Sequence, residues 1–458
     1  MATTALNVEH VDALATVCSG TLLGPTDAGY EEARRVHNGL VDKRPALIVR
    51  CHGAADVADA IRFARDEGLE ISVRGGGHNV AGRAVADGGL MIDLAELKGI
   101  HVDPVARTVR AQGGVTWAEF NRETAVHGLA VTGGAISTTG IAGLTLGGGL
   151  GWLMGIHGLA ADNVRSIELV TARGDVLHVT AMSEPDLFWA LRGGGGNFGV
   201  AVSFEYGLHP LGEVVGGLVA HPFEAAGDVL RFYRELTASS PDELTVFAGL
   251  VHAPDGSGLK LAVLAACHAG SPEQAEEDLA PVRAFGQPVL AEIGPMPYPV
   301  MNTLLDAGYP RGALNYWKTS FVDALDDGFI DTAIERFSTT PSPMNAILLE
   351  HYHGAVTRIG ATETAVPHRE PGYNMLIPSV WLDPDETKAN IAWTRETVEA
   401  LKPYVATRRW LNYLGDDDGD DAVRAAYGPN YERLLEVKRR FDPENVFHLN
   451  HNLDPSVI

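Results

Sequence analysis

The sequence predicts an α+β fold in which two regions of different character follow one another. Residues 45–210 mix short apolar runs with helical segments but show no regular strand–helix–strand array. Residues 213–402 contain longer strand-like runs separated by helices, a pattern typical of an antiparallel sheet with helices on one face. The predicted division is a first domain at 1–212 with its core at about 41–211, a second domain at 213–402, and a C-terminal segment at 403–458.

Apolar spacing predicts the elements of the first region in order. A helix at 54–67 precedes a strand at 70–73, which leads into a glycine-rich loop. A second helix is expected at 116–127, with Thr116 as its N-cap. The other predicted elements are strands 90–94, 108–111, 164–171, 176–179 and 198–208, and a short helix at 184–191.

The second region alternates longer strands with helices. The predicted strands are 244–252, 259–268, 314–321, 346–352 and 373–381. The predicted helices are 223–238, 272–284, 326–338 and 385–401. A last helix at 431–441 is followed by a tail that we expect to fold back onto the first domain.

Composition narrows the classes of partner. The 458 residues carry 35 basic and 59 acidic side chains, so the formal net charge is −24. Such a surface argues against nucleic acids and anionic membranes, and leaves neutral or cationic small molecules as partners. We read no signal peptide and no membrane span, and expect a cytoplasmic protein. The spacing of Cys18, Cys51 and Cys267 suggests neither a disulfide framework nor a metal site.

Three glycine-rich stretches predict a long cofactor lying along the backbone. The first, Arg74-Gly75-Gly76-Gly77-His78-Asn79, places a histidine after three glycines, and the others span 132–151 and 192–200. Glycines let the backbone approach a ligand closely, and consecutive N–H groups form concavities that suit phosphate. Arg74 would add a positive charge for a diphosphate. A strand–GxGxxG–helix turn is absent from the sequence, which argues against a Rossmann domain.

Several motifs in these stretches carry a family resemblance. RGGGHNVAG, TTGIAGLTLGGGLGW, GLAADNVRSIELVTARGDV, DLFWALRGGGGNFGV and the late FHLN occur in this order along the chain. The chain resembles FAD-linked oxidases of the vanillyl-alcohol-oxidase (PCMH-type) superfamily, berberine-bridge-enzyme-like branch, over essentially its whole length. The resemblance implies a two-subdomain FAD-binding domain and a substrate domain over the flavin ring. It also implies hydride transfer from an alcohol, a sugar or a secondary metabolite to the flavin, which O2 reoxidises to give H2O2.

The resemblance implies that His78 is bonded covalently to the flavin. Many relatives form a second bond from a cysteine, but Ile136 stands at that position here, so a single bond is expected. Thr139 stands where many oxidases have valine, and a threonine at this position resembles the pattern of a subgroup whose flavin forms an N5-oxide. An oxygenase of that type is therefore an alternative. A non-catalytic flavin-binding or metabolite-binding protein is a third hypothesis. Thr139 itself has a simpler explanation, namely that it is a packed residue with no role at the flavin.

The loops and the resemblance together assign a set of cofactor-binding residues. Val200 is expected near the adenine and Asn450 near the ring. The full set is Arg74, Gly75, Gly76, Gly77, His78, Asn79, Gly82, Gly133, Thr138, Thr139, Gly140, Gly143, Leu144, Gly148, Gly149, Gly199, Val200, Asn412 and Asn450.

Catalytic candidates come from two other segments. Trp410 replaces the first tyrosine of a family Tyr-x-Asn-Tyr motif, and its indole offers no base. Strand alternation would put Trp410 and Asn412 on one face and Tyr413 on the other. A second strand would carry Glu350 and Tyr352 on one face, which either serve catalysis or simply face solvent. The expected catalytic set is Asn412, Glu350, Tyr352, Thr139 and Tyr413.

Aromatic residues of the second domain are candidates for contact with a substrate. Tyr309, Tyr316 and Trp317 lie in elements of that domain and could sandwich a substrate, although packing in the core is the ordinary explanation for such residues. His351 and His353 are spaced as a pair of metal ligands, but no third ligand follows at a suitable spacing, so no metal is expected.

Overall fold

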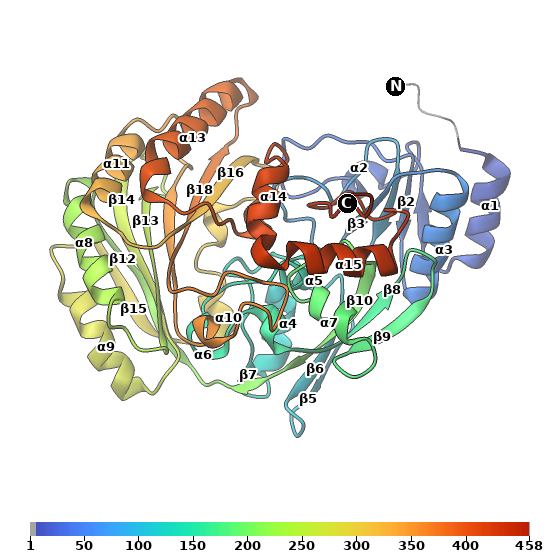
Figure 1. Cartoon of the computed structure of the whole chain (residues 1–458). Coiled ribbons are helices and arrows are strands. Elements are labelled where there is room, and N and C mark those ends of the chain that lie inside the picture. Colours follow the sequence, from blue (N-terminus) through green and yellow to red (C-terminus); the bar gives the residue numbers. More distant parts are fainter. Residues whose placement is uncertain (1–5, 458) are drawn as a thin grey trace.

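The computed structural model describes residues 6–457, whose strands form four sheets (Figure 1). The first sheet has four strands in the order β1–β2–β4–β3, and β4 pairs in parallel with both β2 and β3. Its strands are β1 (Thr21–Leu23), β2 (Leu47–Arg50), β3 (Ile71–Arg74) and β4 (Leu90–Asp93). The nearby helices are α1 (Val8–Val17), α2 (Tyr30–Ala33) and α3 (Ala54–Asp66).

The second sheet is antiparallel, in the order β5–β6–β10–β8–β9. Its strands are β5 (Ile100–Asp103), β6 (Thr108–Gln112), β8 (Val164–Val170), β9 (Val176–Thr180) and β10 (Val200–Gly207). Thr116 is the N-cap of helix α4 (Trp117–Ala125), as the sequence predicts, and the structure adds a capping box in which Thr116 and Glu119 bond each other's backbone N–H. The short elements of this region are α5 (Ile141–Leu146), α6 (Met154–His157), α7 (Pro185–Ala190), β7 (Leu129–Ala130) and β11 (His209–Pro210).

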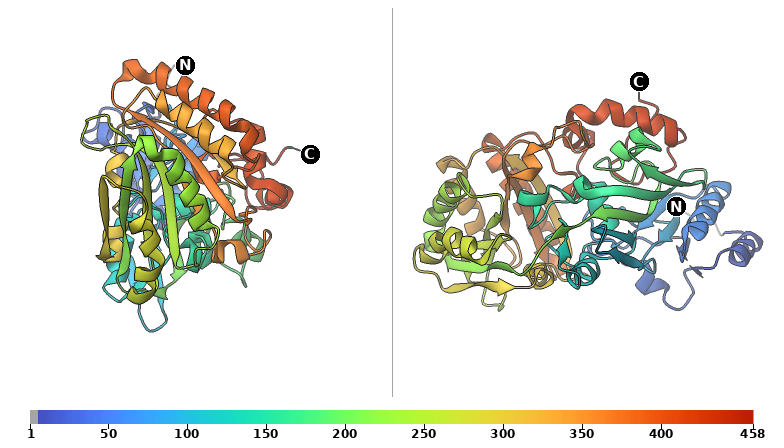
Figure 2. Two further views of the ribbon diagram at one scale, coloured as in Figure 1. Left: turned by 90° about the vertical axis from the view of Figure 1, so that its left-hand side faces the viewer. Right: turned by 90° about the horizontal axis from the view of Figure 1, so that it is seen from below.

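The largest sheet is antiparallel and has seven strands in the order β15–β12–β14–β13–β17–β18–β16. They are β12 (Val214–Pro222), β13 (Leu244–His252), β14 (Lys260–His268), β15 (Leu290–Met296), β16 (Leu314–Val322), β17 (Ile347–Tyr352) and β18 (Gly372–Trp381). Four helices cover its outer face (Figures 1 and 2). They are α8 (Ala226–Thr237), α9 (Pro272–Ala284), α11 (Asp327–Ser338) and α13 (Thr387–Leu401).

Alternation along these strands separates two surfaces of the large sheet. In β13, Val246, Ala248 and Leu250 enter the core formed with the four helices. The intervening Phe247, Gly249 and Val251 face the opposite way, toward a cavity. The prediction of an antiparallel sheet covered by helices on one face is confirmed, and the uncovered face is free to form one wall of a site.

The C-terminal segment packs against the first half of the chain. It contains α14 (Asp420–Tyr427) and α15 (Tyr431–Phe441). The buried Lys438 ammonium of α15 donates to the Asn197 carbonyl oxygen at 2.8 Å and pairs with Asp442 at 2.6 Å. The segment thereby holds the third glycine-rich stretch in place. The domain boundaries predicted at 212 and 402 stay predictions. Within residues 6–457, no helix combines the length and apolar character that a membrane crossing needs.

Candidate active site

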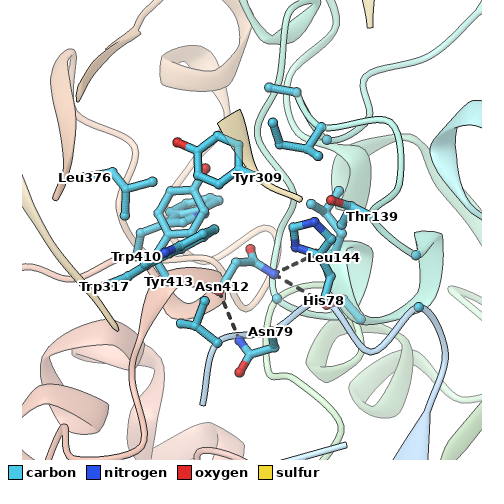
Figure 3. Close-up of a pocket in the computed structure, with 18 of the residues that line it drawn as sticks. His78, Asn79, Thr139, Leu144, Tyr309, Trp317, Leu376, Trp410, Asn412 and Tyr413 are labelled. Carbon is cyan, nitrogen blue, oxygen red and sulfur yellow. Dashed lines mark hydrogen bonds between the residues drawn. The ribbon is translucent and has the colours of Figure 1, made fainter. Parts of the chain in front are cut away.

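A cavity of about 740 Å³ lies between the glycine-rich loops and the uncovered face of the large sheet. Figure 3 shows His78, Thr139 and Leu144 on one side, and Tyr309, Trp317, Leu376 and Tyr413 on the other. The cavity is therefore built from segments that are more than 300 residues apart in the sequence.

The first two glycine-rich stretches meet at a contact that only glycines permit. A Cβ atom on Gly76 would lie 2.5 Å from the Gly140 nitrogen, and one on Gly140 would lie 2.4 Å from the Gly76 nitrogen. Gly77 has a φ of +64°, a left-handed conformation that favours glycine. The contact brings the His78 loop against the loop of Thr139 and leaves both loops lining the cavity.

His78 is held neutral at the wall of this cavity. Its ring stacks on His37 with 4.0 Å between centroids, and its buried Nε2 atom has no hydrogen-bond partner. Burial, followed by the neighbouring His37, lowers the pKa of His78 to about 3. A neutral imidazole with an unpartnered nitrogen fits a covalently attached group, as the family resemblance requires. Within residues 6–457, none of the three cysteines lines the cavity.

The structure corrects the role expected of Arg74. Its guanidinium turns away from the cavity and is buried against Asp93, with Nε donating to the Asp93 carboxylate at 2.9 Å. It also donates to the Ala33 carbonyl oxygen at 2.6 Å. A charge that is already paired with a buried carboxylate is not available to a diphosphate. Arg74 instead fixes the end of β3 from which the loop starts.

Most of the other predicted cofactor-binding residues line the cavity. They are Gly75, Gly76, Gly77, His78, Asn79, Thr139, Gly140, Gly143, Leu144, Gly199, Val200, Asn412 and Asn450. Gly82, Gly133, Thr138, Gly148 and Gly149 do not line it.

The glycines outside the lining serve packing instead. A Cβ atom on Gly133 would strike the Trp117 ring at 2.3 Å, and one on Gly82 would strike Val41 at 2.3 Å. Gly148 and Gly149 adopt positive φ; a Cβ atom on Gly149 would clash with Leu144 at 2.6 Å, and one on Gly148 would lie only 3.0 Å from Val366 and 3.1 Å from Trp410. Thr138 is exposed. At these positions the dense glycine pattern led to a wrong prediction of ligand contact. The glycines are there because the protein packs closely against itself.

Asn412 holds the cavity together rather than offering a free reactive group. Its side-chain nitrogen donates to the Leu144 carbonyl oxygen at 3.1 Å, and its side-chain oxygen accepts from the Gly149 N–H at 3.3 Å. Asn79 donates to the Asn412 carbonyl oxygen at 3.1 Å (Figure 3). The expected catalytic role of Asn412 is therefore replaced by a positioning role, because its amide is committed to the loop backbone.

Glu350 and Tyr413 form the reactive pair of the cavity. The Tyr413 hydroxyl donates to Glu350 at 2.9 Å, and the Asn374 side chain donates to the other Glu350 oxygen at 2.6 Å. Burial raises the pKa of Glu350 to about 7, and these two hydrogen bonds oppose the rise. Burial and the adjacent Glu350 raise the pKa of Tyr413 well above its ordinary value. Glu350 is thus balanced between its acid and base forms near neutral pH.

Tyr352 and Trp410 lie elsewhere than the sequence patterns predicted. Tyr352 is fully buried outside the cavity lining, and its hydroxyl donates to the His368 carbonyl oxygen at 2.9 Å, so it is structural. Residues Leu411–Tyr413 form a 3₁₀ turn and not a strand. Because strand alternation does not apply there, Trp410, Asn412 and Tyr413 all line the same cavity.

Aromatic rings frame the Glu350–Tyr413 pair. Trp317 packs edge-on against Tyr413 with 6.0 Å between ring centroids and against Tyr309 at 5.4 Å. Tyr316, by contrast, points outward and donates to Asp417 at 2.7 Å. The three rings in the cavity suit a flat or apolar substrate.

Sequence reasoning missed three polar residues of the site. His37 stacks on His78 from outside the glycine motif. Arg83 lines the cavity and has an unpartnered buried Nε, and His451 lines it with an unpartnered buried Nδ1. Arg83 directly follows the RGGGHNVAG motif and could have been inferred from that place. His37 shows no local signal, because only the tertiary fold brings it to His78.

The fold and the site define a flavin-dependent oxidoreductase, and comparison with known proteins identifies the family. A family model for an FAD binding domain matches residues 45–180, and a model for berberine and berberine-like proteins matches residues 409–454. An FAD-linked oxidoreductase of Dictyostelium discoideum is 31% identical, over 90% of this chain and 89% of its own length. The (R)-6-hydroxynicotine oxidase of Paenarthrobacter nicotinovorans is 32% identical, over 95% of this chain and 97% of its own length.

A solved structure agrees with these matches. The crystal structure of 6-hydroxy-D-nicotine oxidase from Arthrobacter nicotinovorans superimposes with a TM-score of 0.87 at 30% identity, covering 96% of this chain and 98% of that one. The chain belongs to the berberine-bridge-enzyme-like family of FAD-linked oxidoreductases. It is an enzyme, and its cofactor is FAD.

Proposed function

We propose that this enzyme is an oxidase whose FAD is attached by a single bond to His78. Its substrate is a small organic molecule with a hydroxyl or amine group, O2 is the electron acceptor, and H2O2 is the product. The observation that carries the proposal is the Glu350–Tyr413 pair, because it faces the same cavity as the neutral His78.

Glu350 acts as the proton acceptor in this proposal. A substrate hydroxyl or ammonium group beside the pair would give its proton to the Glu350 carboxylate, directly or through the Tyr413 hydroxyl. Asn374 fixes the carboxylate by its hydrogen bond at 2.6 Å. Trp410 cannot share this task, because an indole N–H only donates.

The remaining residues bind and orient. When bound, FAD supplies a two-electron acceptor that passes the electrons to O2. The substrate loses two electrons and two protons, and O2 gains both to become H2O2. The Gly76–Gly140 contact and the Asn412 hydrogen bonds keep the loops in register. Tyr309, Trp317 and Tyr413 exclude water and hold an aromatic or apolar substrate.

An anaerobic substrate screen tests the proposal. The holoenzyme is mixed with benzylic alcohols and hydroxylated aromatic amines, and bleaching of the visible flavin band is recorded. Admission of O2 should restore the band and yield one H2O2 per product. Glu350→Gln should bleach at least a hundredfold more slowly, since removal of a general base costs about 10²–10⁴-fold. Oxygen from labelled O2 in the product, without stoichiometric peroxide, would replace the oxidase proposal with the oxygenase that Thr139 suggests.

A further inference from the structure

The cavity continues beyond the reactive pair as a second arm. One arm is lined by the glycine-rich loops that receive FAD in this family. The other runs along the uncovered face of β12, β13, β14 and β17, away from Glu350. Phe247 pairs with Glu350 and Gly249 with Leu348, so the arm follows the strand direction. At a strand rise of about 3.3 Å per residue, the four steps along the chain from Glu350 to Ala346 span about 13 Å.

The surface of this arm is small and apolar. Its floor is formed by alternate residues on neighbouring strands, namely Leu218, Gly249, Val251, Val263, Ala265 and Leu348. None of the described residues that β12, β13 and β14 contribute to the lining is charged, and the only polar one is His252. Asn345, at the far end, already donates to Asn390 at 2.7 Å and accepts from the Val380 N–H at 2.9 Å. The arm thus offers burial to an apolar group and no ionic partner to a charged one.

The far end of the arm reaches the surface. There the lining includes Pro254 and Gly256, in the turn between β13 and β14, and Pro343, all of which are exposed. Leu382 also lines this end with 69% of its surface exposed. An elongated molecule can therefore enter at this mouth with one end reaching Glu350.

We propose that the substrate carries an unbranched or slender apolar tail of several carbons, which lies in this arm while its hydroxyl or amine group meets Glu350 and Tyr413. This proposal rests on the proposed function, because it takes from it that the reacting group lies beside Glu350 and Tyr413. The arm itself acts as the specificity-determining site for chain length. Gly249 is its central residue, because a Cβ atom there would lie 2.8 Å from Leu348 Cδ2 and 3.3 Å from side-chain atoms of Val251 and Val263.

Calorimetric titration of the holoenzyme with phenol and 4-alkylphenols, from methyl to pentyl, tests the tail site. Affinity should rise about fourfold for each added methylene that is buried. Gly249→Val narrows the arm, because its Cβ atom forces the flexible end of the Leu348 side chain to shift and its methyl groups add volume there, while β-branched residues suit a strand. This variant should bind phenol within twofold of the wild type but lose most of the gain from the longer tails. Val263→Ala, which widens the arm, should keep that gain.

A matched control comes from the same sheet. Gly294 in β15 lies outside the cavity lining, and no atom lies within 4 Å of a Cβ built there. Gly294→Val should show the wild-type dependence on tail length. Wild-type affinity that is independent of tail length, or an undiminished gain in Gly249→Val, would overturn the proposal and make the arm a passage for water or O2. Failure of every phenol to bind the wild type would overturn it too.

Anaerobic bleaching of the flavin separates this inference from the proposed function. Binding that depends on tail length, without bleaching by any member of the series or of the earlier screen, leaves the tail site in place and removes the oxidase proposal. Bleaching without any dependence of affinity on tail length leaves the oxidase proposal in place and removes the tail site.

Discussion

At the scale of single residues, burial holds two titratable groups in forms that water would not favour. His78 stays neutral because its ring is desolvated beside His37. Glu350 titrates near pH 7 because its carboxylate is desolvated and only partly compensated by Asn374 and Tyr413. Perturbed groups that share one cavity are typical of catalytic sites. Both residues could be singled out from the sequence, but the cause of each pKa shift lies in the tertiary fold.

The attachment of flavin to His78 predicts a change in acid-denatured protein. After acid precipitation, the wild type should keep its yellow colour, whereas His78→Ala should release all of its flavin. His52→Ala is a suitable control, because 46% of the His52 side chain is exposed and it lies outside the cavity lining. Colour retained by His78→Ala, or lost by the wild type, would contradict a single bond at this residue.

The role of Glu350 predicts a pH profile. If the carboxylate accepts the proton, kcat/KM should rise as the pH increases through about 7 and then level off, because only the ionised form is a base. Glu350→Gln should lack this limb altogether. Activity that falls as the pH rises through 7 would mean that the protonated form is required.

The same pKa shift predicts an effect on stability. A carboxyl group whose folded-state pKa exceeds its ordinary value of 4.5 binds protons more tightly when folded, so its ionisation destabilises the fold as the pH rises from about 4.5 to about 7. Glu350→Gln should therefore gain up to about 3 kcal/mol of unfolding free energy relative to the wild type at pH 8, compared with pH 4. Denaturant unfolding at both pH values measures this difference, and an equal gap at both would argue against the shift.

At the scale of elements, the regularity of the apolar spacing decides which helices and strands can be predicted from the sequence. The prediction for β13 coincides with the structure, and helices such as α9 were also predicted within a residue or two, because their apolar spacing is regular. Strands β12 and β15 were missed, since the first contains Gly216 and Gly217 and the second contains Gly294 and Pro295. The turn Leu411–Tyr413 was predicted as a strand, because three residues carry no periodicity.

The contact between the glycine-rich loops predicts the effect of one added methyl group. Gly76→Ala puts a Cβ atom 2.5 Å from the Gly140 backbone nitrogen, which cannot move as a side chain can. We expect a loss of about 1–3 kcal/mol of unfolding free energy, typical of overpacking, together with less bound flavin. Gly212→Ala, at an exposed glycine with no atom within 4 Å of its Cβ position, should leave both quantities unchanged. Full flavin content in Gly76→Ala would show that the loops can separate without harm.

At the scale of the whole molecule, the site exists only because the two halves of the chain meet. Asn302, directly after the short helix Tyr298–Met301, donates to the Gly134 carbonyl oxygen at 2.6 Å, and Asp306 accepts from the Ser137 backbone N–H at 2.9 Å. Such long-range contacts leave no local pattern in the sequence. The motifs therefore predicted the cofactor class and much of one wall, whereas the opposing pair of Glu350 and Tyr413 required the fold to bring it to His78.

One buried asparagine makes this meeting of the halves testable. The Asn38 side chain donates to the Val80 carbonyl oxygen at 2.8 Å and to the Asn315 carbonyl oxygen at 2.9 Å, and it accepts from the Asn315 N–H at 2.9 Å. It thereby ties the loop that carries His78 to β16. Asn38→Ala would leave buried backbone groups unpaired, which costs about 1–3 kcal/mol for each group that water cannot reach.

We expect Asn38→Ala to lower the unfolding midpoint by several degrees and to loosen the flavin site before the rest of the chain unfolds. Thermal unfolding followed in parallel by flavin fluorescence and far-ultraviolet circular dichroism should then give two separate transitions, where the wild type gives one. Asn7→Ala removes only an exposed helix cap, worth about 1 kcal/mol, and should keep the transitions coincident. Coincident transitions in Asn38→Ala would mean that the halves are joined by their other contacts, such as the Asp306–Ser137 bond, strongly enough to unfold as one.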